Sequence, residues 1–73
     1  MVEIREIGKP KHDVILIWDI LMRSWTLTIK DAKERLVKLA KKYGDKVIEI
    51  DYVRREIRFD GVRVFKFKYL YWV

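Results

Sequence analysis

The stretch TIKDAKERLVKLAKKYG, residues 28–44, contains the start, the interior and the end of one helix. Thr28 is a suitable N-cap, and Asp31 follows three residues later, where its carboxylate lies favourably in the first turn. Gly44 is the residue type expected in the left-handed position after the last turn. Apolar residues recur at spacings of three and four between these ends: Ala32, Leu36, Leu39, Ala40 and Tyr43. The stretch therefore predicts a helix over residues 28–43 with one buried face.

The sequence period changes to two after this helix, which is typical of strands. Apolar residues alternate with polar ones here: Ile48, Ile50, Tyr52, Ile57 and Phe59. A turn centred on residues 54–55 would set Ile50 opposite Phe59. It would also set Asp51 opposite Arg58 as a cross-strand ion pair.

Asp60-Gly61 is the strongest hairpin signal in the chain and predicts a two-residue type I′ turn. Such a turn sets Ile57 opposite Val64, with both side chains toward the helix. Beyond this point aromatic residues and lysines alternate in the other phase: Phe65, Lys66, Phe67, Lys68 and Tyr69. This change of face predicts a β-bulge near residues 64–65, or a strand that is buried on both sides.

The N-terminal part of the chain has two short strand patterns and one ambiguous segment. Residues 2–7 alternate as a strand, and residues 8–13 form a loop. The segment VILIWDILM, residues 14–22, is rich in β-branched residues, which favours a central strand. A second helix over residues 13–24 is the alternative. Residues 26–29 predict a short strand that runs directly into the main helix.

These segments predict an α+β fold, in which a twisted, mostly antiparallel sheet packs one face against the helix of residues 28–43. Residues 1–73 are long enough for a single domain with one core. One helix cannot cover both faces of a sheet, so the aromatic residues of the C-terminal strand need another partner. We expect them to pack against residues 14–25, which favours a monomer. A homodimer through the C-terminal strand is the alternative.

The composition excludes several kinds of site. The chain has no Cys, so neither a disulfide nor a thiolate metal site can form. It also lacks Asn and Gln, and 38% of its residues are charged, a pattern typical of hyperthermophile proteins or of computed sequences. The formal charge of +6 comes from interleaved charges, which indicates a solvated surface first and a polyanion partner second. No cofactor and no metal are predicted.

The sequence also bears on location and catalysis. Residues 1–5 lack the apolar stretch that follows the basic start of a secretion signal. The longest apolar run, residues 14–22, contains Asp19 and is far shorter than the roughly 20 residues that span a bilayer. We therefore expect a soluble, cytoplasmic protein, or a synthetic one. One His, one Ser and three Gly provide no nucleophile–base pair and no phosphate-binding loop. An enzyme is not predicted, and His12 is expected to be a surface loop residue.

HDVILIWDI, residues 12–20, resembles the third strand of response-regulator receiver domains, in which an aspartate at the strand end accepts phosphate. Receiver domains also need an acidic pair after an earlier strand and further βα units, for which this chain is too short. The phosphoacceptor role is therefore not assigned to Asp19. We expect Asp19 to be partly exposed or paired with an arginine.

FKFKYLYW, residues 65–72, interleaves aromatic residues with lysines, as a sheet does when it presents stacking surfaces between phosphate contacts. Basic residues on neighbouring strands extend this pattern. The candidate nucleic-acid-binding residues are Arg54, Arg55, Arg58, Arg63, Lys66, Lys68, Tyr69 and Tyr71. The alternative interpretation is that the aromatic rings belong to the core and the lysines protect an edge strand from aggregation.

KDAKERLVKLAKKYGDKVIEI, residues 30–50, resembles computationally designed α/β proteins in its capping, its Lys/Glu/Leu/Ala composition and its Gly-Asp exit into a β-branched strand. The resemblance is one of style, and the loop GKPKHD, residues 8–13, departs from it. It implies a stable, non-enzymatic scaffold with no evolved activity and no required partner. The sequence thus predicts a designed or redesigned scaffold first, and a basic nucleic-acid-binding module of hyperthermophile type second.

Overall fold

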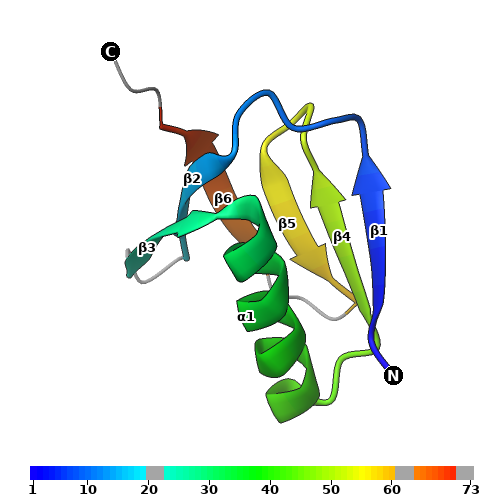
Figure 1. Cartoon of the computed structure of the whole chain (residues 1–73). Coiled ribbons are helices and arrows are strands. Elements are labelled where there is room, and N and C mark those ends of the chain that lie inside the picture. The colour runs from blue at the N-terminus through cyan, green and yellow to red at the C-terminus, as the bar shows by residue number, and fades with distance from the viewer. Residues whose placement is uncertain (20–22, 61–63, 71–73) are drawn as a thin grey trace.

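The computed structural model describes residues 1–19, 23–60 and 64–70, which form one helix and a six-stranded sheet (Figure 1). The elements are β1 (Glu3–Ile7), β2 (Val14–Trp18), β3 (Ser24–Thr28), α1 (Ile29–Tyr43), β4 (Val47–Asp51), β5 (Glu56–Phe59) and β6 (Val64–Tyr69). The strand order is β1-β4-β5-β6-β2-β3. β1 and β4 are parallel, and the other neighbours are antiparallel. The predicted α+β fold is therefore confirmed.

Both ends of α1 form as the sequence predicts. The Thr28 hydroxyl accepts a hydrogen bond from the Asp31 amide at 3.2 Å. At the other end Gly44 has φ 78°, and its amide donates to the Lys41 carbonyl at 3.4 Å. A positive φ is strained for other residues, so glycine stabilises this end of the helix.

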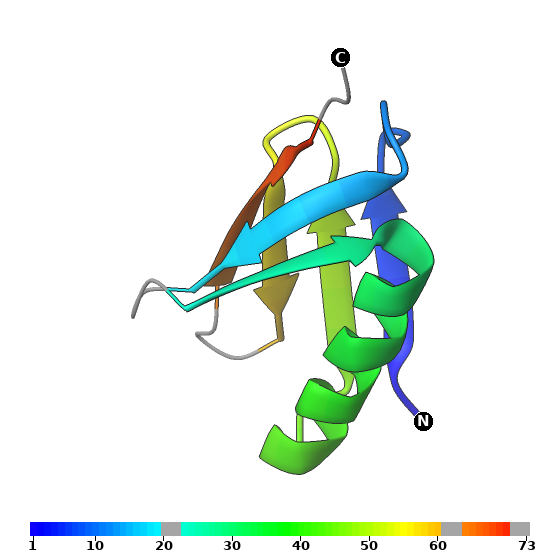
Figure 2. The same ribbon diagram turned by 60° about the vertical axis from the view of Figure 1, so that its left-hand side comes forward.

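The core lies between α1 and one face of the sheet (Figures 1 and 2). Its buried apolar residues are Ile15, Ile17, Ala32, Leu36, Ala40, Ile48, Ile50, Tyr52, Ile57, Phe59, Phe65, Phe67 and Tyr69. Leu39 is half-buried at the margin of this core. Tyr43, predicted as part of the buried stripe, is 46% exposed. The last turn of α1, which ends at Tyr43, extends beyond the end of the sheet (Figure 2).

A polar contact joins β1, β4 and α1 on the same face. The Tyr52 hydroxyl donates to Glu6 at 2.6 Å, and the Lys33 ammonium donates to the other Glu6 oxygen at 3.1 Å. The hydrogen bond from Tyr52 holds the pKa of Glu6 below its ordinary value. Burial, and then the bond to Glu6, raise the pKa of Tyr52. This contact fixes the parallel strand β1 beside β4.

The β4–β5 hairpin has a different register from the predicted one. Ile50 pairs with Ile57 rather than with Phe59, and Glu49 rather than Asp51 lies opposite Arg58. The connection spans residues 52–55 because the Asp51 carboxylate accepts hydrogen bonds from two following amides, at 3.0 and 2.9 Å. The shift is by two residues, so every side chain keeps its predicted face.

The β5–β6 register is offset by one residue from the one predicted from a two-residue Asp60-Gly61 turn, so the predicted pairing of Ile57 with Val64 is wrong. Ile57 pairs with Phe65, and Arg58 pairs with Val64. Gly61 itself lies outside the described residues. An offset of one exchanges the faces of β6, and it buries three aromatic rings in place of Val64, which is 47% exposed. The predicted bulge or change of face at residues 64–65 is therefore wrong as well.

β2 confirms the strand interpretation of residues 14–18, and a helix over residues 13–24 is wrong. β3 begins at Ser24, two residues before the predicted strand, and residues 20–22 lie outside the described residues. The Asp19 amide donates to the Arg23 carbonyl at 3.1 Å, and the Arg23 amide donates to the Asp19 carboxylate at 3.1 Å. The two side chains also form an ion pair of 2.8 Å, which closes this hairpin. Asp19 is therefore a buried, arginine-paired carboxylate, as expected.

β6 pairs with β2, so its aromatic residues lie beside residues 14–18, as the sequence predicts. The ring centroids of Phe65 and Trp25 are 6.2 Å apart, which extends this packing to β3. Tyr71 and Trp72 lie outside the described residues. No helix in the described part of the chain is long and apolar enough to span a membrane.

Candidate nucleic-acid interface

α1 is the described element that packs on the sheet, and it leaves the other sheet face uncovered (Figures 1 and 2). The uncovered face divides into two halves of different chemistry. The first half, on β1, β4 and β5, has the charged residues Glu3, Arg5, Glu49, Asp51, Glu56 and Arg58. The second half, on β6, β2 and β3, has the residues Val64, Lys66, Lys68, Leu16, Trp18 and Thr26. We call these the carboxylate half and the lysine half.

Arg58 lies at the centre of the carboxylate half and is surrounded by acids. Its guanidinium donates to Glu49 at 3.0 Å, to Glu56 at 2.9 Å and to Asp51 at 3.2 Å. The bond to Glu49 raises the pKa of Arg58. The Arg54 amide, followed by the Arg58 side chain, holds the pKa of Asp51 below its ordinary value. A guanidinium that already serves three carboxylates has little capacity left for a phosphate.

Lys66 and Lys68 differ from Arg58 in having no ionic partner among the described residues. Their side chains are exposed, and neither forms an ion pair within the described ranges. Lys66 is the register partner of Trp18, and Lys68 is the register partner of Leu16. Trp18 is half-buried, so part of its indole reaches the surface between the two strands. The lysine half therefore combines unpaired ammonium groups with an aromatic surface.

Arg54 and Arg55 lie close to the same strand. The Phe67 amide donates to the Arg55 carbonyl at 3.1 Å, which places the β4–β5 turn beside the middle of β6. Both arginine side chains are exposed, and Arg55 adopts φ 61°. The structure thus brings together four of the predicted residues, which with Trp18 form what we call the β6 surface: Arg54, Arg55, Lys66, Lys68 and Trp18.

The remaining predicted residues do not join this surface within the described chain. Tyr69 is 7% exposed and points toward α1, and its hydroxyl donates to the Tyr52 carbonyl at 3.4 Å. Its ring is therefore part of the core. Arg63 and Tyr71 lie outside the described residues. The register partner of Arg58 on β6 is Val64.

Trp18 is the member of this surface that the sequence interpretation did not assign. The strand period gives the signal: Ile15 and Ile17 are buried, so Leu16 and Trp18 must point to the other face. The sequence leaves open which of the two faces the helix covers. That choice requires the register of β2 against β6.

The described residues provide no other chemical centre. Among residues 1–19, 23–60 and 64–70, no three His, Asp or Glu side chains lie close enough to hold a metal ion. The His12 imidazole accepts a hydrogen bond from the Val14 amide at 3.3 Å. Comparisons with protein-family models, with curated proteins and with solved structures found no match to this chain.

Proposed function

We propose that this protein is a non-enzymatic module that binds single-stranded nucleic acid through the β6 surface. The observation that supports this proposal most strongly is the pairing of Lys66 with Trp18 on the uncovered face, beside Lys68. Glu56, the register partner of Lys66 on β5, accepts a hydrogen bond from Arg58 at 2.9 Å. An ammonium group next to an aromatic ring matches the repeating unit of a single strand, a phosphate followed by a base.

The distribution of charge supports the same surface. Three carboxylates on the uncovered face gather around Arg58, which offsets one of their three charges. The basic groups of the β6 surface have no such partners within the described ranges. Phosphate contacts by unpaired lysines release counterions, which is the main source of affinity in non-specific nucleic-acid binding.

A single strand fits this surface better than a duplex does. The face of β6 and β2 is part of a six-stranded sheet, which is broader than the single helix or two-stranded ribbon that fits the major groove of B-form DNA. Unpaired bases can instead stack on the exposed part of Trp18. Such stacking contributes roughly 1–3 kcal/mol for each base, with little dependence on sequence.

The test is fluorescence anisotropy with a labelled oligonucleotide of about 12 nucleotides, over a series of salt concentrations starting near 50 mM. The double variant Lys66→Glu, Lys68→Glu should bind much more weakly. Its slope of log K against log salt should be smaller by roughly 1.4, the value for two lost phosphate contacts on a single strand. The matched control is Lys30→Glu, Lys41→Glu, which changes the net charge equally but on α1, across the sheet.

Two outcomes contradict the proposal. If the α1 control weakens binding as much as the β6 variant does, affinity follows net charge and the β6 surface is not the site. If the unmodified protein shows no binding near 50 mM salt, nucleic-acid binding is excluded. That second result would favour the competing prediction, a stable designed scaffold without evolved activity.

A further inference from the structure

The two edges of the sheet differ in how they are protected. β1, at one edge, has the charged residues Glu3, Arg5 and Glu6. β3, at the other edge, has the sequence SWTLT and contains no charged residue and no proline. Natural edge strands usually have charges, bulges or prolines that prevent pairing with another chain. An uncharged edge strand is suited to accept a partner strand.

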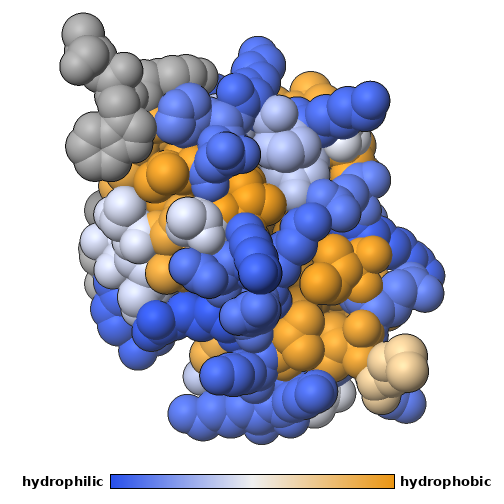
Figure 3. Space-filling view, in the orientation of Figure 1, coloured by the Kyte–Doolittle hydropathy of each residue, from blue (hydrophilic) through white to orange (hydrophobic). Residues whose placement is uncertain are grey.

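α1 forms one wall of a groove along this edge. β3 and α1 are joined directly at residues 28–29 and diverge from that point (Figure 2). The space between them has a volume of about 550 Å³. Figure 3 shows apolar side chains exposed between hydrophilic ones on the face of the molecule that α1 covers. The groove therefore lies next to strand backbone that has no partner strand in the described sheet.

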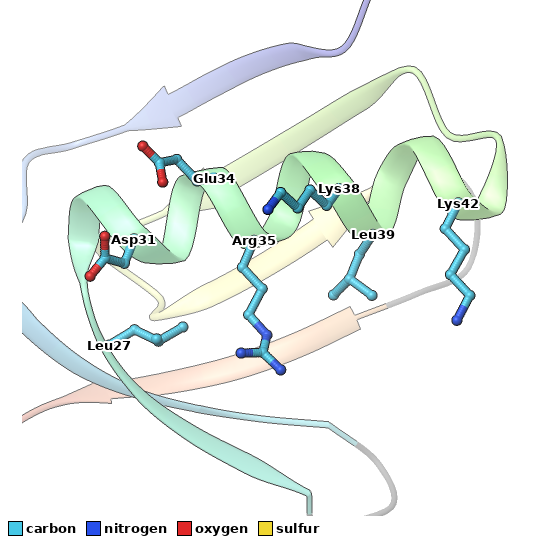
Figure 4. A pocket seen from close by; sticks show the side chains of 7 residues that line it. All are labelled: Leu27, Asp31, Glu34, Arg35, Lys38, Leu39 and Lys42. Atoms are coloured by element: carbon cyan, nitrogen blue, oxygen red, sulfur yellow. The ribbon is translucent and has the colours of Figure 1, made fainter.

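The side chains in the groove change in character along its length (Figure 4). Its residues are Leu27, Asp31, Glu34, Arg35, Lys38, Leu39 and Lys42. The acidic pair lies at the narrow end, near the start of α1. The three basic residues lie toward the wide end, and the half-buried leucines give the groove apolar contacts. The Arg35 guanidinium lies 5.1 Å from the centroid of the Trp25 ring, which positions this charge over β3.

We propose that this groove binds an extended acidic peptide segment of a partner protein, which pairs with β3 as a seventh strand. Side chains of an added strand alternate between the two faces of a sheet. One set of its side chains therefore enters the groove, where apolar residues meet Leu27 and Leu39. Carboxylates nearby meet Arg35, Lys38 and Lys42.

A second copy of this chain fits the edge less well. Pairing of β3 with β3 of another molecule would bring the two α1 helices to the same region. Each α1 has six basic and two acidic residues, so the two helices repel one another. The charge of the groove thus favours an acidic partner over self-association.

The probe is a fluorescent peptide of about eight residues whose alternate, groove-facing positions are leucine and glutamate in turn and whose other positions are threonine, compared with the same peptide in which lysine replaces glutamate. The glutamate peptide should bind, and the lysine peptide should not. Lys38→Glu, Lys42→Glu should weaken binding by about tenfold or more. The matched control Lys30→Glu, Lys41→Glu, outside the groove, should change affinity by less than about twofold.

N-methylation of the peptide tests the strand pairing itself. Amides of an added strand point alternately toward β3 and toward solvent, so methylation of one alternate set should abolish binding and methylation of the other set should not. In labelled protein, the amide signals of residues 24–28 should shift when the unmodified peptide is added.

Four results would overturn the proposal. Equal binding of the two peptides would show that the groove does not select acidic segments. Equal effects of the two methylated sets would exclude strand pairing. A dimer mass in sedimentation equilibrium that changes to a monomer mass when the peptide is added would assign β3 to a second copy. Displacement of the peptide by the oligonucleotide, with an affinity that depends on Lys38 and Lys42, would assign the groove to nucleic acid.

Discussion

The two faces of β6 belong to one strand but have different roles. On the face toward α1, three aromatic residues are buried: Phe65, Phe67 and Tyr69. The Phe67 ring packs edge-on against Tyr52 and Tyr69, at centroid distances of 6.2 and 5.7 Å. On the other face Lys66 and Lys68 are exposed and contribute no ion pair within the described chain. The strand thus separates residues that hold the fold from residues that are free to bind.

A second contrast lies within the uncovered face. Arg58 and Lys66 are both cationic and lie on adjacent strands, yet Arg58 has three carboxylate partners and Lys66 has none among the described residues. A basic residue in a strand pattern is therefore not a binding residue by type alone. Its availability depends on whether the acids beside it are bound elsewhere, as Glu56, the register partner of Lys66, is bound by Arg58.

The largest loss of stability is expected from a substitution on the covered face of β6. Phe67→Ala should lower the free energy of unfolding by about 3–5 kcal/mol, because it removes a fully buried ring. Urea unfolding followed by circular dichroism measures this value. A cost below about 1 kcal/mol would place Phe67 at the surface and contradict the register of β6.

A smaller loss of stability is expected from a substitution in the carboxylate half. Arg58→Met keeps the aliphatic stem but leaves three carboxylates facing one another without their cation. We expect the midpoint of thermal unfolding to fall by roughly 5 °C, with oligonucleotide affinity unchanged within about twofold. A fall in affinity as large as that of Lys66→Glu, Lys68→Glu would show that Arg58 belongs to the interface.

The hydrogen-bonded carboxyl groups of Glu6 and Asp51 predict that the free energy of unfolding depends on pH. The folded pKa values of Glu6 and Asp51 both lie below their ordinary values of 4.5 and 3.8. The unfolded chain therefore takes up protons first as the pH falls. The stabilisation is complete above about pH 4.5 and is lost as the pH falls through the folded values.

Urea unfolding at pH 6 and at pH 3 measures this dependence. Asp51→Asn should have a smaller difference between the two pH values than the unmodified protein, because one of the two depressed carboxyl groups is removed. Equal differences in the two proteins would show that Asp51 does not contribute.

The smallest effect on stability is expected at Lys66. Lys66→Ala should change the free energy of unfolding by no more than about 0.5 kcal/mol, since the side chain is exposed and has no described ionic partner. Oligonucleotide affinity should nevertheless fall. A loss of stability comparable to that of Phe67→Ala would show that the two faces of β6 are not distinct.

Local sequence signals were sufficient for the elements of the fold. Thr28, Asp31 and Gly44 specify the ends of α1, because capping depends on residues within one turn of each end. The alternation of residues 47–59 specifies two strands and their faces. The position of β1 beside β4 was not predictable in this way, since it depends on pairing between residues 3–7 and 47–51, which are far apart in the sequence.

The strand registers predicted for β4–β5 and β5–β6 were wrong for a related reason. The length of the β4–β5 turn depends on the Asp51 side chain and on the positive φ of Arg55, which residue type does not indicate. At the candidate site, the alternation around Lys66 and Lys68 indicated correctly that they share a face. Tyr69 belongs to the core rather than to the site, because an offset of one residue exchanges the two faces of a strand.

The most direct test of the proposed function follows the fluorescence of Trp18 alone. The variant Trp25→Phe, Trp72→Phe retains this single indole on the uncovered face, and Trp18→Phe, Trp72→Phe retains Trp25 on the covered face as the control. Titration with a single-stranded oligonucleotide should quench Trp18, because a base stacks on its ring, and should leave Trp25 unchanged. Addition of salt should reverse the quenching. Binding detected by anisotropy without a change in Trp18 fluorescence would contradict the proposed interface.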